Sequence, residues 1–99
     1  MLRLDSMTLL GMGLLTEFAR RHPQARSWIS AWSKEVQSAV WRRPQDVKDR
    51  YASASILDNE RVIFNVKGNA FRLEVRINYD AGIVRVIRCG THADYDRWT

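Results

Sequence analysis

The 99-residue sequence predicts a single α+β domain in which two helices pack on a mainly antiparallel β-sheet and a short helix follows the sheet. Apolar residues recur at spacings of three and four before residue 41, as they do in amphipathic helices. Three strand-like runs, RVIFNV, AFRLEVRINY and IVRVIRC, come next and are separated by the turn signals KGN and YDAG. The segment THADYD after the last run starts with a capping pattern that is typical of a helix N-terminus.

The N-terminal part predicts a short strand and a first helix. Thr8–Leu10 is a candidate edge strand, and Gly11 and Gly13 follow it as breakers. The first helix has its apolar stripe at Leu14, Leu15 and Phe18. Its last turn is basic, which suits the negative end of the helix dipole, and Pro23 then ends the helix.

A second helix is predicted from apolar residues at helical spacing, namely Trp28, Ile29, Trp32, Val36 and Val40. Two tryptophans one turn apart could stack on nucleic-acid bases, but burial is favoured because helices shield their apolar stripe against a sheet. The two helices are expected to form an antiparallel hairpin. After it, Pro44 opens a short helical turn, PQDVKDRY, and the segment SAS returns to loop.

The first two strands of the sheet fit a hairpin with a two-residue turn at Gly68-Asn69. This turn places two cross-strand pairs on the polar face, Asn65 with Arg72 and Arg61 with Arg76. The apolar residues of both strands then share the other face. The third strand alternates only as far as Val86, so either a β-bulge or burial on both faces is needed beyond that point.

The composition favours an anionic partner and a reducing compartment. The formal net charge is +5, which makes nucleic acid the first candidate, with a merely soluble basic protein as the alternative. Cys89 is the only cysteine, which rules out an internal disulfide and fits the cytoplasm. No apolar run is long enough to span a membrane. The sequence has no metal-ligand spacing and no nucleotide-binding loop, so we expect no metal and no cofactor.

Candidate proton-transfer groups lie in the C-terminal segment. Thr91 and Asp94 form the capping pattern, and on the helix that it starts His92 and Tyr95 share one face. His92 would lie in the first turn, where backbone N–H groups favour a phosphate. Histidine also titrates near neutral pH, which suits proton transfer in the cleavage of an RNA phosphodiester. In the structural alternative, His92 caps a loop and Tyr95 packs on the sheet.

Cations on the polar face of the hairpin could hold the phosphate. Arg72 has a planar fork that binds phosphate through two hydrogen bonds, and Lys67 beside the turn could contact the RNA backbone. The structural role of Arg72 would be an ion pair with Glu74 or Asp96, or a hydrogen bond to Asn65, and it is compatible with phosphate binding. Lys67 could simply be solvated. We expect a wider RNA-binding track at Arg61, Asn65, Arg76, Arg85 and Arg88.

These segments resemble the HigB family of type II toxins, which are RelE-like mRNA interferases. The resemblance rests on FNVKGN, FRLEVRINY and GTHADYD, with RRHPQA and WRRPQDVKDRYASASIL upstream, and covers about residues 7–98. Asp94 stands where the family usually has glutamate, which keeps the charge. The family's usual start falls at Met7, so residues 1–6 are expected to be an extension and residues 7–99 the toxin domain.

The resemblance implies a RelE/ParE-like fold and metal-independent cleavage of mRNA on the translating ribosome. His92, Tyr95, Arg72 and Lys67 would then be the catalytic residues. It also implies a helix-turn-helix antitoxin of the HigA type, through which alone the toxin would reach operator DNA. Two other functions stay open: a ParE-type toxin that acts on DNA gyrase, and a non-catalytic module that binds RNA without cutting it.

Overall fold

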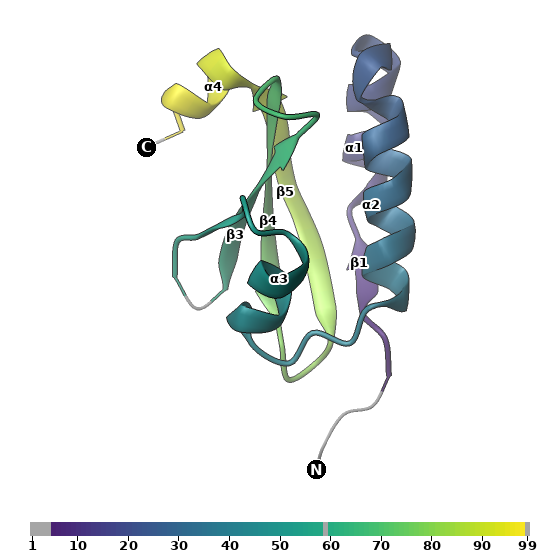
Figure 1. Cartoon of the computed structure of the whole chain (residues 1–99). Helices are drawn as coiled ribbons and strands as arrows, with labels where there is room; N and C mark the ends of the chain where they lie inside the picture. The colour runs from purple at the N-terminus through teal and green to yellow at the C-terminus, as the bar shows by residue number, and fades with distance from the viewer. Residues whose placement is uncertain (1–4, 59, 99) are drawn as a thin grey trace.

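The computed structural model describes residues 5–58 and 60–98 and has the α+β architecture that the sequence predicts (Figure 1). In chain order the elements are β1 (Thr8–Leu10), α1 (Met12–Arg21), a 3₁₀ turn (Pro23–Ala25), α2 (Arg26–Ser38), α3 (Pro44–Arg50), β2 (Ser55–Ile56), β3 (Arg61–Val66), β4 (Phe71–Asn78), β5 (Ile83–Thr91) and α4 (His92–Asp96). The strands form one sheet in the order β1-β5-β4-β3-β2. Strands β2 to β5 pair antiparallel and β1 pairs parallel with β5, so the sheet is mixed.

The β3–β4 hairpin has the predicted register. Its cross-strand pairs include Asn65 with Arg72 and Arg61 with Arg76. In the turn, the Ala70 N–H donates to the carbonyl oxygen of Lys67 at 3.3 Å. Lys67 and Gly68 have φ values of 51° and 65°, and glycine adopts this left-handed region without steric cost. The alternation of apolar residues and the turn therefore fix the same pairing.

A β-bulge in β5 explains why its alternation breaks down. The flanking cross-strand pairs are Glu74 with Arg88 and Val75 with Val86. Ile87 between them is an extra residue on β5, so the bulge is the correct one of the two explanations. The bulge returns Arg88 to the polar face of the sheet. Beyond Cys89 the strand continues through Gly90 to Thr91, further than its apolar run.

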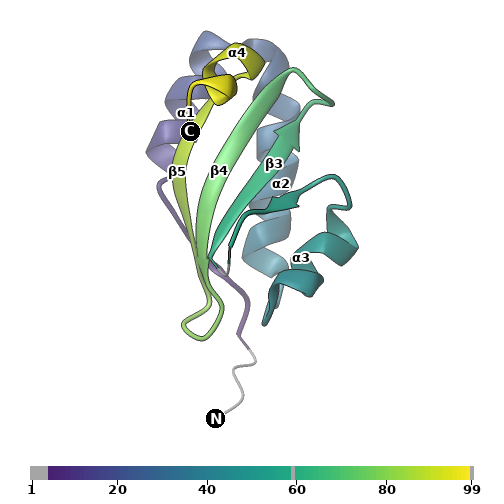
Figure 2. The ribbon, with the colours of Figure 1, turned by 90° about the vertical axis from the view of Figure 1, so that its left-hand side faces the viewer.

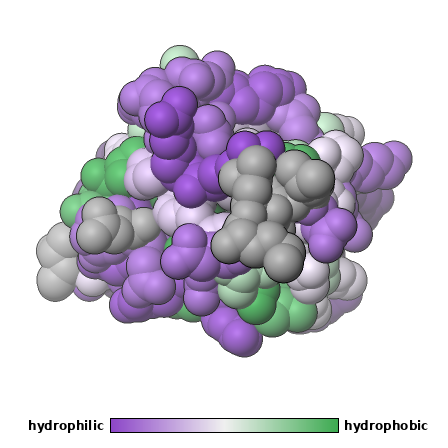
Figure 3. Space-filling view, turned by 90° about the horizontal axis from the view of Figure 1, so that it is seen from below, coloured by the Kyte–Doolittle hydropathy of each residue, from purple (hydrophilic) through white to green (hydrophobic). Residues whose placement is uncertain are grey.

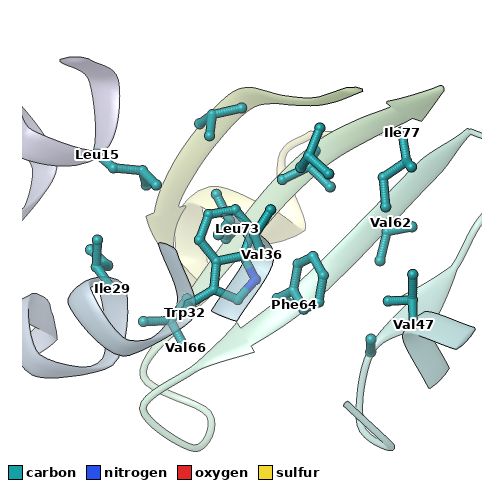
Figure 4. Close-up of a cluster of buried hydrophobic side chains, with 14 of the residues drawn as sticks. Leu15, Ile29, Trp32, Val36, Val47, Val62, Phe64, Val66, Leu73 and Ile77 are labelled. Carbon is teal, nitrogen blue, oxygen red and sulfur yellow. The ribbon is translucent and has the colours of Figure 1, made fainter. Parts of the chain in front are cut away.

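The hydrophobic core lies between the sheet and the helices α1 and α2 (Figure 4). Trp32 of α2 and Phe64 of β3 are each 1% exposed, and their rings pack edge to face with 5.4 Å between centroids. Leu15 of α1 and Val47 of α3 are also fully buried. Burial of Trp32 confirms its predicted place in the core. Trp28 is half-buried and stacks on Trp32.

Three residues lie in places that the sequence pattern does not predict. Gly13 is inside α1, and only Gly11, at the helix N-cap with a φ of 91°, separates β1 from the helix. Leu14 is 38% exposed, because Leu15 is the residue that α1 turns toward the sheet. Val40 lies beyond the last residue of α2 and is 37% exposed. The apolar stripes of the two helices are therefore narrower than expected.

The two faces of the sheet have different surroundings. Figures 1 and 2 show α1 and α2 on one side of the sheet and α4 on the other. Strand alternation places one set of residues on the side of α4, which we call the open face: Arg61, Ile63, Asn65, Arg72, Glu74, Arg76, Arg85, Arg88 and Gly90. Figure 2 looks onto this face, where α4 covers only one end.

The predicted N-terminal extension falls partly outside the described residues, because residues 1–4 are not among them. Asp5 and Ser6 are exposed, whereas Met7 is 3% exposed and its N–H donates to the carbonyl oxygen of Ala39 at 2.9 Å. Contact with the core therefore begins at Met7 within the described chain. Seen from this end, the surface is mostly hydrophilic with scattered apolar patches (Figure 3).

Candidate active site

Arg72 lies on the open face beside α4 and is held firmly in place. Only 8% of the residue is exposed. Its Nη1 donates to the carbonyl oxygens of Asn69 and Phe71 at 3.3 and 3.2 Å. Its guanidinium carbon lies 5.5 Å from the centroid of the Tyr95 ring, a cation–π contact. The backbone and an aromatic ring therefore orient Arg72.

The polar neighbours that could have bound the Arg72 side chain bind other groups. No carboxylate within the described chain forms an ion pair with Arg72. Glu74 binds two other arginines, and Asp96 lies near His92. The Asn65 amide donates to the carbonyl oxygen of Ser53 at 3.3 Å. The predicted ion pair of Arg72 with Glu74 or Asp96, and its predicted hydrogen bond to the Asn65 side chain, are therefore wrong.

The short helix α4 starts at the predicted capping box. The Asp94 N–H donates to Thr91 Oγ1 at 3.1 Å, and the Thr91 N–H donates to Asp94 Oδ2 at 2.9 Å. The hydrogen bond from the Thr91 N–H holds the pKa of Asp94 below its usual range. Gly90 lets the helix lie close to β5, since a Cβ there would come within 2.8 Å of Asp94 Cβ and 3.1 Å of Trp98 Cζ2.

The four predicted catalytic residues gather at one end of the sheet. Thr91, just before α4, is the cross-strand partner of Phe71, which follows the β3–β4 turn. Tyr95 contacts Arg72, whereas His92 and Lys67 are exposed. His92 Nε2 is 4.0 Å from Asp96 Oδ1, which is too far for a hydrogen bond. Direct contact thus joins Arg72 and Tyr95 only.

Helix α4 has five residues, so its dipole adds little to phosphate binding. The expectation that its first turn attracts a phosphate at His92 therefore carries little weight. Cationic side chains around α4 are the stronger source of anion binding.

Glu74 occupies the middle of the open face and is only 3% exposed. Its Oε1 accepts from Arg88 Nε at 2.9 Å, and its Oε2 accepts from Arg61 Nε at 3.2 Å. Burial raises the pKa of Glu74, but the hydrogen bonds from Arg61 and Arg88 lower it by more, so it stays below its usual range. Two arginines of the predicted RNA-binding track are thus bound to a carboxylate.

The remaining arginines of the track, Arg76 and Arg85, are exposed cross-strand partners on β4 and β5. Arg76 Nη1 is 3.9 Å from an exposed carboxylate oxygen of Glu60, and an exposed ion pair of this kind contributes little to stability. A shallow pocket at this end of the sheet is lined in part by Glu60, Arg76 and Arg85. Like charges directly opposite each other destabilise a sheet. The pair of Arg76 and Arg85 is therefore better explained by binding of an anion than by a contribution to stability.

The sequence reasoning missed Trp98. Its ring lies 4.4 Å from the Arg88 guanidinium carbon and meets the Tyr95 ring edge to face at 5.6 Å between centroids. The spacing of three residues between Tyr95 and Trp98 was the available signal, because such residues lie on the same side of a helical turn. Trp98 therefore belongs to the site.

The arrangement offers cationic side chains that can bind a phosphate. It also offers a hydroxyl group and an imidazole that can transfer protons. Among the described residues, no group of three or more His, Cys, Asp or Glu side chains is placed to hold a metal ion. Within those same residues, the helices are too short or too polar to cross a membrane.

Comparison with known proteins places the chain in a family. The HigB toxin family, described as the RelE-like toxic component of a toxin–antitoxin system, matches residues 25–98. Relatives include the mRNA interferase toxin HigB of Escherichia coli strain K12 and the mRNA interferases HigB of Escherichia coli O157:H7 and Shigella flexneri. Each is 24% identical over 98 residues, covering 94% of this chain and 91% of the relative. Because the family match spans well over half of the sequence, this chain belongs to the HigB family of RelE-like toxins.

Proposed function

We propose that this toxin is an endoribonuclease that cleaves mRNA with its own side chains and without a metal ion. The observation that carries the proposal is Arg72, buried, held by two carbonyl oxygens and set against the Tyr95 ring at the end of a cationic face. The names of the relatives, which are mRNA interferases, support the same activity.

RNA carries its own nucleophile, the ribose 2′-OH, which attacks the adjacent phosphorus while the 5′-oxygen leaves. The reaction needs a base, an acid and positive charge on the developing phosphorane. Arg72 and Lys67 would supply the charge. Arg72 is already oriented, so little reorganisation opposes the reaction. His92 and Tyr95 would be the proton-transfer pair.

The RNA strand would continue from the site along the open face. Arg76 and Arg85 are the exposed cations on that path, and Asn65 lies next to Arg72 across the hairpin. Arg61 and Arg88 would contribute less, since Glu74 offsets their charge. Replacing Arg76 or Arg85 by Gln should weaken RNA binding and lower its salt dependence by about one unit per lost phosphate contact.

The proposal extends to architecture and partners. The helix pair over the apolar face supports a RelE/ParE-like arrangement for residues 7–99, with residues 1–6 as an extension. Translating ribosomes would present the mRNA. A helix-turn-helix antitoxin of the HigA type would neutralise the toxin, and operator DNA would be reached only through that antitoxin. Co-expression with such an antitoxin should restore growth and yield a stable complex.

The decisive experiment compares three variants at the site with one elsewhere. His92→Ala, Tyr95→Phe and Arg72→Ala should each cut ribosome-bound mRNA roughly a hundred- to ten-thousand-fold more slowly than the parent. Combining two of them should add little, because members of one catalytic unit are not additive. Arg43→Ala removes one exposed positive charge beside α3 and serves as the matched control. It should cut at the parent rate.

Thermal melts of the same proteins separate loss of activity from loss of fold. Well-folded site variants that cut at the parent rate would remove these residues from the mechanism. A parent protein that binds RNA with salt-dependent affinity but never cuts it would favour the non-catalytic module. Arrest of replication with translation intact would favour an action on DNA gyrase.

A further inference from the structure

An unbroken series of contacts runs from the middle of the sheet to the proposed active site. Glu74 accepts a 2.9 Å hydrogen bond from Arg88 Nε. The Arg88 guanidinium carbon lies 4.4 Å from the centroid of the Trp98 ring, and Arg88 Nη2 donates to the Trp98 carbonyl oxygen at 3.3 Å. The Trp98 ring meets the Tyr95 ring edge to face, and Tyr95 contacts Arg72.

Helix α4 needs contacts beyond its own backbone to hold its position. It has five residues and none of them is buried, whereas an isolated helix of this length is not stable in water. The capping box fixes the start of the helix at Thr91, but it does not fix the direction in which the helix leaves the sheet. Trp98, packed against Arg88, provides the second attachment.

Glu74 is an unexpected residue on a face that we assign to RNA. Its negative charge reduces the attraction of the face for a polyanion, and an apolar residue would fill the same buried position. Each of its oxygens instead accepts from the Nε of a different arginine, Arg61 and Arg88. The bond from Arg88 Nε to Glu74 and the bond from Arg88 Nη2 to the Trp98 carbonyl oxygen hold the Arg88 guanidinium in the orientation that stacks on Trp98.

We propose that Glu74 is a positioning residue of this toxin, which acts through Arg88 and Trp98 to hold Tyr95 against Arg72. This inference rests on the proposed endoribonuclease activity. Glu74 itself does not touch the reacting phosphate. It makes the geometry of the site depend on an ion pair in the centre of the sheet.

The first test is Glu74→Gln, which keeps the size of the side chain and replaces one acceptor oxygen by a donor. Loss of the fixed orientation should lower the single-turnover cleavage rate by about a hundred-fold. Binding of a 2′-O-methyl RNA, which cannot be cut, should stay the same or tighten because a negative charge has left the face. A variant that had merely lost stability would instead lose cleavage and binding together.

Glu60→Gln is the matched control. It removes the same charge from the same side of the sheet, and its partner Arg76 lies opposite Arg85, away from the end of β5 where α4 begins. It should therefore cut at the parent rate while binding the uncut RNA slightly more tightly. Equal loss of cleavage in Glu60→Gln and Glu74→Gln would make the effect one of charge and overturn the proposal.

Variants of Trp98 test the same series of contacts at the end next to Tyr95. Trp98→Phe keeps a ring for Arg88 and Tyr95 and should retain most of the activity. Trp98→Ala should cut as slowly as Glu74→Gln, and the double variant should be no slower than either single one. Cleavage by Trp98→Ala at the parent rate would show that Tyr95 needs no such support.

Amide hydrogen exchange gives a readout that does not depend on activity. In Glu74→Gln and Trp98→Ala the amides of Arg97 and Trp98, which bond to Asp94 and Tyr95, should exchange faster than in the parent. The β3–β4 amides should keep their protection. Unchanged exchange in α4 would overturn the proposal. A parent protein that never cuts mRNA would defeat the proposed function instead, and exchange would still decide whether Glu74 holds α4.

Discussion

The two faces of the sheet are made by the same strands but are stabilised in different ways. On the face under α1 and α2, rings and aliphatic chains such as Trp32 and Phe64 exclude water over a broad area. On the open face, single hydrogen bonds and ring contacts fix side chains such as Arg72 and Glu74 one by one. The first arrangement tolerates small shifts, whereas the second loses its geometry when one partner is removed.

The largest expected difference in stability comes from replacing a tryptophan by alanine on each of the two faces. Trp32→Ala should cost roughly 3–5 kcal/mol of unfolding free energy, because a fully buried ring is lost and a cavity remains. Trp98→Ala on the open face should cost only about 1 kcal/mol, the scale of a half-exposed cation–π contact. Denaturant unfolding of both variants measures the difference, and equal losses would mean that the open face also supports the fold.

Gly90→Ala should act on the open face alone. The added Cβ would come within 2.8 Å of Asp94 Cβ, so α4 must move away from β5. We expect a loss of about 1–3 kcal/mol of stability and slower mRNA cleavage, while near-ultraviolet circular dichroism of the buried tryptophans stays unchanged. A Gly90→Ala variant with parent activity would show that α4 can shift without moving Tyr95.

The acid side of the stability curve should depend on Glu74. Its folded-state pKa lies below the ordinary value of 4.5, so its contribution is complete above that value and is lost as the pH falls through the folded-state pKa. Thermal melts from neutral pH downward should therefore fall less steeply for Glu74→Gln than for the parent. Parallel curves for the parent and Glu74→Gln would contradict this.

The smallest effect is expected at the N-terminus. A chain that starts at Met7 should unfold with a free energy within about 0.5 kcal/mol of the parent and keep its toxicity, because Asp5 and Ser6 are exposed. A chain that starts at Leu9 is the control. It loses buried Met7 and its hydrogen bond to Ala39, so its unfolding free energy should fall clearly. A large loss on removal of residues 1–6 would contradict the extension.

The apolar face could be predicted from the sequence because alternation and turn chemistry are local rules. They gave the hairpin register, which places apolar pairs such as Val62 with Val75 and Phe64 with Leu73 on the side of α1 and α2. The errors at Gly13, Leu14 and Val40 fall at the ends and edges of helices, where tertiary packing outweighs local preference.

On the open face the residue types and the cross-strand pairs of the hairpin could be predicted, but not the partners that the side chains bind. Arginines on the polar side of the strands were evident, but which of them Glu74 would bind depends on the bulge at Ile87. That bulge brings Arg88 opposite Glu74, and the sequence pattern left it undecided. The role of Trp98 depends in turn on Arg88, so it could not be found without the three-dimensional arrangement.

The pairing of β1 with β5 also has a consequence for the order in which the protein folds. Thr8 pairs with Ile83, so one of the first segments to leave the ribosome must wait for one of the last strands to be made. Contacts between residues so far apart in sequence form slowly, because a long loop must close first. Residues 90–98, which complete the site, are made later still. A growing chain would thus lack the assembled candidate site until its synthesis is nearly complete.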